Sequence, residues 1–146
     1  MKDKNAVVTG AASGLGRAFC SEIGARRGRV LVCDIDEEGA QETIELVEAA
    51  GGEARFQHCN VASNDEVEAA SAAAEAWFGH TDLLVNNAGV AVAGPMEDIP
   101  LSDWEWIMGI NLWGVIYGCR AFLPGMKRKG EGHIINVASA AGPQVA

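Results

Sequence analysis

Three glycines near the start of the chain have the spacing of a loop that binds a pyrophosphate. The segment Thr9–Gly16 reads Thr-Gly-Ala-Ala-Ser-Gly-Leu-Gly, between an apolar run and a helical pattern. Gly10 permits a tight turn, Gly14 lets the backbone approach a phosphate, and Gly16 allows close packing of a helix on a strand. The free N–H groups and the positive dipole at the start of that helix favour an anion. A mononucleotide P-loop would need Gly-Lys-Ser/Thr, which Gly16-Arg17-Ala18 does not supply.

An acidic residue follows at the distance expected for a ribose contact. Asp34 lies 18 residues beyond Gly16, at the end of a second apolar run. A carboxylate at that place accepts hydrogen bonds from the ribose hydroxyls of the adenosine half of NAD. Its charge repels a 2'-phosphate, and the neighbours Ser13 and Ile35 are not basic. The sequence therefore favours NAD over NADP. The alternative, that Asp34 only caps the next helix, fits Asp36 better.

These residues require alternating strands and helices to position them. Apolar runs predict strands at 5–9, 30–34, 55–60, 82–86 and 132–139, and periodic patterns predict helices at 14–27, 37–50, 63–78 and 102–123. Such alternation predicts a doubly wound parallel sheet, an α/β Rossmann-like fold with strand order 3-2-1-4-5, as one domain over residues 1–146. Ligands of such sheets bind beyond the carboxyl ends of the strands.

Polar signals predict where the helices begin and end. Ser63–Glu66 and Ser102–Glu105 both have the pattern of a capping box, in which a serine and a glutamate satisfy the first N–H groups of a helix. Gly51 and Gly52 are expected to end the second helix.

Composition narrows the classes of partner. The 20 acidic and 11 basic residues give a net charge of -9, so nucleic acid and anionic membranes are poor partners. No uninterrupted run of about 18 apolar residues and no signal sequence are present, and we expect a cytoplasmic protein. The four cysteines and three histidines have no ligand-like spacing. Reduced thiols and no metal site are therefore expected.

A second motif, taken with the glycine loop, gives the chain a family resemblance. Asn86–Gly89 reads Asn-Asn-Ala-Gly after the fourth strand, and Thr9–Gly16 matches Thr-Gly-x-x-x-Gly-x-Gly. Over its whole length the chain resembles the short-chain dehydrogenase/reductase family. The resemblance implies that Asn86 ties the central strands together. It further implies that the cofactor is bound by Gly10, Ser13, Gly14, Leu15, Gly16, Asp34, Asn60, Val61, Asn87, Ala88 and Gly89.

One position departs from the family pattern. Asn60-Val61 stands where the family usually has Asp-Val. The asparagine keeps a carbonyl that can accept from the amino group of adenine, so we expect the adenine contact to persist.

The resemblance also implies catalytic residues. Asn111 follows Trp104 in the pattern Trp-x6-Asn and is expected to anchor a proton-relay water, while Ser139 is expected to orient the substrate oxygen. An amide within the apolar stretch Ile107–Val115 must find a partner or strain its helix. Trp113 either shapes a pocket or belongs to a core or an interface.

The family tyrosine and lysine are not found in these residues. The single tyrosine, Tyr117, lies in a predicted helix and is followed four positions later by Ala121 rather than lysine. A Tyr-x-x-x-Lys motif is expected beyond Ala146, and the fifth strand would leave a free apolar edge. We therefore expect a longer protein of about 250 residues, with the C-terminal strands missing from these 146. We expect the 146 residues alone to be inactive, because general acid catalysis needs that pair.

The function that follows is an NAD-dependent oxidoreductase. It would interconvert a small secondary alcohol and a ketone by hydride transfer, as a homo-oligomer when complete. A non-catalytic NAD-binding module is the alternative. A methyltransferase with a similar glycine loop would explain neither Asn86–Gly89 nor the pair Asn111 and Ser139.

Overall fold

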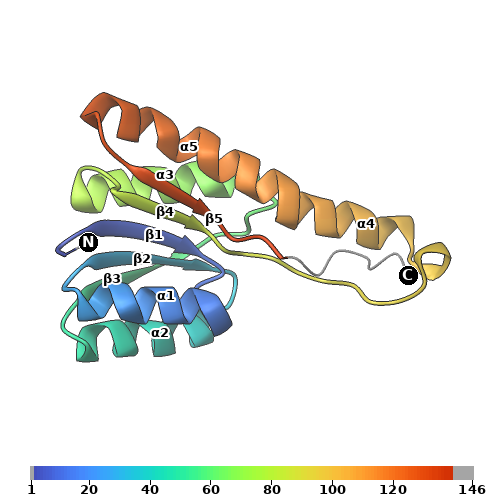
Figure 1. Ribbon diagram of the computed structural model, residues 1–146, viewed down its shortest axis with the longest axis horizontal. Helices are drawn as coiled ribbons and strands as arrows, with labels where there is room; N and C mark the ends of the chain where they lie inside the picture. The colour runs from blue at the N-terminus through green and yellow to red at the C-terminus, as the bar shows by residue number, and fades with distance from the viewer. Residues whose placement is uncertain (1, 140–146) are drawn as a thin grey trace.

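The computed structural model describes residues 2–139 as a parallel sheet with helices on both faces (Figure 1). Each crossover returns the chain to the same end of the sheet, so the five strands of this part run parallel. Their order is β3-β2-β1-β4-β5. The strands are β1 (Asn5–Thr9), β2 (Arg29–Asp34), β3 (Glu53–His58), β4 (Leu83–Asn86) and β5 (His133–Asn136). The predicted fold class and strand order are confirmed.

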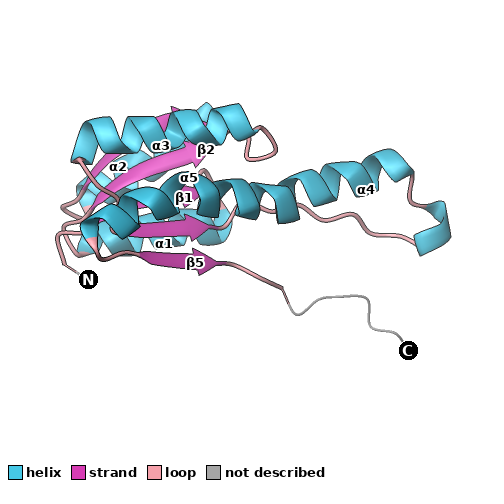
Figure 2. Ribbon diagram, turned by 90° about the horizontal axis from the view of Figure 1, so that it is seen from above, coloured by secondary structure: helices cyan, strands magenta, loops and turns pink. Residues whose placement is uncertain are grey.

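The helices form one layer on each face of the sheet. Figures 1 and 2 show α1 and α2 covering one face and α3 and α5 covering the other, while α4 projects beyond the carboxyl ends of the strands. The helical segments are α1 (Gly14–Ala25), α2 (Glu37–Ala49), α3 (Asn64–Phe78), the 3-10 turn η1 (Met96–Asp98), α4 (Leu101–Met108), the π-helical segment η2 (Gly109–Trp113) and α5 (Gly114–Lys129).

The central strand β1 is buried on both faces, as a parallel sheet between two helix layers requires. Ala6 and Val8 pack into the core shared with α1 and α2. Val7, between them, packs into the opposite core with α3 and α5. Alternate residues of one short strand therefore support both layers.

The predicted helix starts are partly correct. Ser63 caps α3 by accepting from the backbone N–H of Glu66 at 3.4 Å, but the Glu66 carboxylate accepts from the N–H of Asn60 at 2.8 Å instead of returning to Ser63. The predicted cap at Ser102 is wrong. Helix α4 already begins at Leu101, after Pro100, with no side-chain cap, because the proline fixes a backbone angle suited to the position before a first turn.

Other boundaries differ by a few residues. Strand β3 occupies 53–58 rather than 55–60, because its register with β2 pairs Arg29 with Glu53. The last helix continues through Pro124 to Lys129 instead of ending near Leu123. The added residues bury Met126 beside Phe122 in the core on this face of the sheet, and this burial offsets the one hydrogen bond that the proline removes.

The stretch Leu101–Lys129 is helical throughout its 29 residues. An 18-residue window within it has a mean hydropathy of 1.2, so by length and composition alone the helix could cross a membrane. The sequence analysis missed this stretch because it looked for an uninterrupted apolar run, and polar residues interrupt this one. Its second half, α5, buries one face, with Gly114, Gly118, Phe122 and Met126, and packs against α3 and β4, as an amphipathic helix that covers a sheet does.

One buried carboxylate joins several elements at the amino end of the sheet. Asp82 is 9% exposed and its Oδ2 accepts from the backbone N–H of Asn5 at 2.9 Å. Its Oδ1 lies 2.9 Å from Nζ of Lys129, 3.6 Å from Nζ of Lys4 and 3.3 Å from Nε2 of His80. Asp82 therefore links β1, β4 and the end of α5.

Protonation of Asp82 should weaken the fold. Burial raises the pKa of this carboxyl, but the Asn5 N–H and the ammonium groups of Lys129 and Lys4 outweigh burial and hold the pKa below its usual 3.8. A carboxyl with a lowered pKa in the folded state stabilises the protein above its unfolded-state pKa. That contribution is lost as the pH falls through the folded-state pKa.

We expect Asp82→Asn to lower the free energy of unfolding at pH 7 by about 2 kcal/mol, because a charged hydrogen-bond acceptor is lost. The difference from the native protein should shrink as the pH falls below 3.8. Urea unfolding at several pH values measures both effects. Glu131→Gln, which removes an exposed partner of Lys129, is the control and should change little. Equal stability of native protein and Asp82→Asn at pH 7 would contradict this role.

Candidate functional site

The carboxyl ends of β1, β2, β3 and β4 enclose a cavity of about 370 Å³. Every residue of the predicted cofactor set except Gly16 lines it, although the predictions come from four separate loops. The lining comprises Gly10, Ser13, Gly14, Leu15, Asp34, Ile35, Cys59, Asn60, Val61, Asn87, Ala88, Gly89, Val90 and Ile110.

The three glycines of the first loop meet three different steric demands. Gly10 has φ +62°, and a Cβ there would lie 2.7 Å from Cα of Ala88. A Cβ on Gly16 would overlap the carbonyl oxygen of Gly10. Gly14 has φ +53°, and a Cβ there would meet nothing within 4 Å, because this residue faces the open cavity. The loop therefore presents bare backbone to any ligand in the cavity.

The start of α1 is open to an external anion. Its N-cap Ser13 makes no side-chain cap, and no acidic residue stands in the first turn. Helices α2 and α3, in contrast, have capping side chains and two acids each in their first turns. The unsatisfied N–H groups and dipole of α1 thus have no anionic partner from its own first turn or cap. Together with the bare Gly14, this end suits a diphosphate.

Asp34 stands beside this loop. Its Oδ2 accepts from the N–H of Ala12 at 2.9 Å, and its Oδ1 accepts from the N–H groups of Ile35 and Asp36 at 2.8 and 3.1 Å. Asp36, not Asp34, caps α2 by accepting from Gly39. A carboxylate has about four acceptor sites, so Asp34 can still accept from a ligand hydroxyl.

The motif analysis did not identify Arg17 as part of this site. Its Nη2 donates to the carbonyls of Ala12 and Gly39 at 2.6 and 3.1 Å and pairs with Glu42 at 2.8 Å. Together with Asp34, Arg17 holds both sides of the loop residue Ala12. The sequence gives no sign that Arg17 of α1 contacts Gly39 and Glu42 of α2, because only the fold brings these two helices together.

The loop after β4 is tied to the loop after β1. Thr9 Oγ1 accepts from the N–H groups of Asn87 and Ala88 at 3.0 and 3.1 Å. Asn87 Nδ2 donates to the carbonyls of Thr9 and Gly10, both at 3.0 Å. These bonds fix the distance between the two cavity walls.

Asn86 lies below the cavity and joins two strands. Its side chain is 3% exposed, and Nδ2 donates to Oδ1 of Asn136 on β5 at 2.8 Å. Gly118 of α5 must lack a side chain, because a Cβ there would overlap Oδ1 of Asn86. The contact is consistent with the strand-tying role that the resemblance implies.

Asn111 lies in the π-helical segment between α4 and α5. Its Oδ1 accepts from the N–H of Val90 at 2.9 Å and its Nδ2 donates to the carbonyl of Val90 at 2.8 Å. The amide thus has the partner that an amide in an apolar helix needs, and it clamps the loop after β4. A π-helical turn widens the helix and disrupts its regular hydrogen bonds, and such turns are frequent at functional sites.

A second cavity of about 680 Å³ adjoins the first. Asn87, Ala88, Gly89 and Val90 line both cavities, so the two are continuous. Asn111 and Ser139 line the second cavity together with Leu112 and Val115, whereas Tyr117 does not. Tyr117 packs instead beside Trp113 with ring centroids 5.8 Å apart. The structure therefore brings the two predicted catalytic residues to one space beyond the cofactor loops.

The buried thiols are not nucleophiles at neutral pH. Burial raises the pKa of Cys20 to about 12 and that of Cys59 to about 11, and it raises the pKa of Cys33 well above its usual value. Cys59 lines the first cavity as a small apolar surface.

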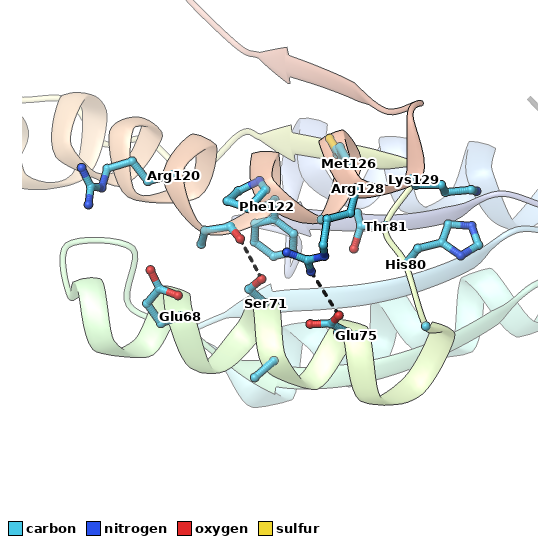
Figure 3. Close-up of a pocket in the computed structure, with 15 residues that line it drawn as sticks. Glu68, Ser71, Glu75, His80, Thr81, Arg120, Phe122, Met126, Arg128 and Lys129 are labelled. Atoms are coloured by element: carbon cyan, nitrogen blue, oxygen red, sulfur yellow. Dashed lines mark hydrogen bonds and ion pairs between the residues drawn. The ribbon is translucent and has the colours of Figure 1, made fainter.

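A groove of about 660 Å³ also lies between α3 and α5, toward the amino end of the sheet (Figure 3). Ser71 Oγ donates to the carbonyl of Ala121 at 3.1 Å, and Arg128 pairs with Glu75 at 3.3 Å. Both contacts cross from one helix to the other. We interpret this groove as a helix junction.

Comparison with known proteins agrees with this arrangement. The model of the family described as short chain dehydrogenase matches residues 4–146. A putative oxidoreductase, SadH, from Mycobacterium tuberculosis is 37% identical over 139 residues, covering 95% of this chain and 50% of that protein. The 3beta-hydroxysteroid dehydrogenase 1 of Eggerthella lenta is 41% identical over 142 residues, covering 95% and 54%.

Solved structures share the same architecture. A short-chain dehydrogenase/reductase from Burkholderia phymatum in complex with NAD has a TM-score of 0.94 and 38% identity, covering 99% of this chain and 52% of that one. A metagenomic short-chain oxidoreductase in complex with NADP has a TM-score of 0.92 and 35% identity, covering 99% and 66%. The chain spans about half the length of the curated relatives it matches.

We expect Asn111→Ala to free the loop after β4. Loss of both hydrogen bonds to Val90 should speed hydrogen exchange of the Val90 amide by about tenfold or more. Asn111→Asp, which keeps the acceptor for this amide, should retain more of the protection. Equal exchange of Val90 in native protein and Asn111→Ala would exclude the clamp.

Proposed function

Because the chain belongs to the short-chain dehydrogenase family, we propose that the complete protein is an NAD-dependent oxidoreductase that interconverts a secondary alcohol and a ketone. The observation that carries the proposal is the position of Asp34. Its carboxylate lies beside the open start of α1 in one cavity with the bare glycine loop. An anion-binding end next to a hydroxyl-binding carboxylate suits a diphosphate linked to a ribose.

The charges around this cavity favour NAD. Asp34 would repel a 2'-phosphate on the adjoining ribose. Arg17, the basic residue of the first helical turns, is bonded to Ala12, Gly39 and Glu42 and is not available to neutralise such a phosphate. Ile35, the next cavity residue, has no charge. The related structures hold NAD in one case and NADP in the other, so the preference rests on these residues.

The second cavity supplies the groups for the chemistry. The nicotinamide, when bound, would supply the acceptor or donor of a hydride. Ser139 Oγ would donate a hydrogen bond to the substrate oxygen, where charge develops during the reaction. The Asn111 amide bonds to Val90 through its oxygen and its nitrogen, and each of these atoms keeps one further hydrogen-bonding position. We therefore propose that Asn111, held in place by Val90, anchors a relay water.

The proton donor is proposed to come from outside these residues. Tyr117 is the single tyrosine of the sequence, and it is not among the described residues that line the second cavity. We propose that a Tyr-x-x-x-Lys pair beyond Ala146 delivers the proton in the complete protein, and that the 146 residues alone are inactive without it.

The substrate is proposed to be a small alcohol or ketone. Two relatives are named for such substrates, a 3beta-hydroxysteroid dehydrogenase and a D-threitol dehydrogenase. We further propose a homo-oligomer, because Trp106, Met108, Leu112 and Trp113 of α4 and η2 are each 44 to 49% exposed. Large apolar side chains exposed together on one helical stretch are typical of contact surfaces.

We expect Asp34→Asn to shift the ratio of NADPH to NADH affinity about tenfold toward NADPH, because a charge that opposes the 2'-phosphate is removed. Fluorescence titration of the complete protein gives both dissociation constants. Asp36→Asn removes the same charge two positions away, outside the cavity lining, and should shift the ratio much less. Native protein that binds NADPH as tightly as NADH would refute the preference.

We expect Ser139→Ala to lower kcat/KM about 100-fold, the loss typical for a donor to a developing oxyanion. The dissociation constant for NADH should stay at its native value, since Ser139 lies outside the first cavity. Ser102→Ala, an exposed serine at the start of α4, is the control. Native kcat/KM in Ser139→Ala would remove Ser139 from the mechanism, and lost NADH binding would assign it to the cofactor instead.

A further inference from the structure

Thr43 is a fully buried polar residue on the side of α2 that packs against the glycine loop. It is 0% exposed, and the other buried residues of α2 are Ala40, Ile44 and Val47. A threonine within a helix can satisfy its hydroxyl by bonding to the carbonyl four residues earlier, and Thr43 Oγ1 lies 3.2 Å from the carbonyl oxygen of Gly39. Its shorter contact lies outside the helix, because Oγ1 donates to the carbonyl of Ala11 at 2.9 Å.

The same hydroxyl joins α2 to Arg17. Arg17 Nε donates to Thr43 Oγ1 at 3.1 Å, and Arg17 Nη2 donates to the carbonyl of Ala12 at 2.6 Å. Thr43 and Arg17 therefore hold the carbonyl groups of two successive loop residues. A Cβ on Gly39 would lie only 3.0 Å from the carbonyl oxygen of Ala12, so α2 packs directly against this part of the loop.

The peptide unit between Ala11 and Ala12 is held at both ends. Its carbonyl accepts from Thr43, and its N–H donates to Asp34 Oδ2 at 2.9 Å. Because the C=O and N–H of a planar trans peptide point in opposite directions, these two bonds fix the plane of the peptide between α2 and the end of β2. Asp34 also accepts from two further backbone N–H groups, so its position does not depend on this peptide alone.

The following peptide unit is oriented in a similar way. The carbonyl of Ala12 accepts from Arg17, so the N–H of Ser13, in the same peptide, points away from Arg17. Ser13 lines the first cavity, whereas Thr43 and Arg17 do not. The carbonyl ends of both peptides are thus directed to donors outside the cavity lining.

We propose that Thr43 is a positioning residue for cofactor binding, which acts with Arg17 to keep the carbonyl oxygens of this loop turned away from the cofactor diphosphate. The proposal rests on the proposed function, in which a diphosphate lies at the open start of α1. A carbonyl oxygen turned toward a phosphate repels it, whereas a peptide N–H attracts it. Thr43 is outside the cavity lining, so its effect reaches the ligand through the loop.

The first test is Thr43→Val, which keeps the shape of the side chain and replaces its hydroxyl by a methyl group. The carbonyl of Ala11, a buried residue, then loses its donor, and its peptide must turn to find another. We expect the dissociation constants for NADH and ADP to rise about tenfold in the complete protein. That for adenosine, which carries no phosphate, should change by less than about twofold. Fluorescence titration with NADH, and competition by ADP and adenosine, measure all three.

The second variant, Thr43→Ser, separates positioning from a merely structural role. It keeps the hydroxyl but removes a buried methyl group. It should therefore lower the melting temperature while leaving the NADH dissociation constant within about twofold of the native value. A merely structural role would make the affinity follow the melting temperature in both variants.

Thr81→Val is the matched control. It makes the same change at the amino end of the sheet, beside the groove of Figure 3, and should keep the native constants for all three ligands. Native NADH affinity in Thr43→Val would overturn the proposal. Equal losses of affinity in Thr43→Val and Thr43→Ser, or an equal loss for adenosine, would do the same. Native protein that binds no NADH at millimolar concentration would instead overturn the proposed function on which this inference rests.

Discussion

The contact between the loops after β1 and β4 is the constraint on which the cavity depends. Asn87 donates to the carbonyls of Thr9 and Gly10, and Gly10 approaches Ala88 so closely that no Cβ fits between them. Two parallel strands end side by side, and their loops would diverge without these bonds. Because the loops are held together, the open start of α1 and the loop of Ala88 and Gly89 form two walls of one cavity.

Electrostatics then decides what the cavity favours. The chain carries a net charge of -9, yet α1 begins without an acid while α2 and α3 each begin with two. Among the residues that line the first cavity, the one negative charge is that of Asp34, which bonds to the backbone of Ala12 beside the open start of α1. Arg17 stabilises the loop by donating to the carbonyls of Ala12 and Gly39, so its guanidinium is already bonded within the protein. The proposed anion site at the start of α1 therefore lies next to Asp34, the carboxylate that would oppose a further phosphate.

Two asparagines show how a side chain's role depends on its partners. Asn111 bonds one residue, Val90, through both ends of its amide and so holds the wall of the cavity. Asn60 uses only its oxygen, on Ala62, and retains its donors. The same functional group holds a distant loop in one place and its own local turn in the other, because the surrounding backbone offers different hydrogen-bonding groups.

The sequence by itself determined the parallel α/β fold, the strand order and ten of the fourteen residues that line the cavity. These follow from local apolar patterns and from glycines whose backbone angles few other residues adopt. It also identified Asp36 as the cap of α2. It did not show that Pro124 would lie inside a helix, that Glu66 would bond to Asn60 instead of completing a capping box, or that Arg17 would support the glycine loop. Only the tertiary structure decided these points, together with the partners of each asparagine amide. Each of these features depends on which groups from distant parts of the chain meet. Hydrogen bonds between distant residues produce no periodic pattern in the sequence from which they could be predicted.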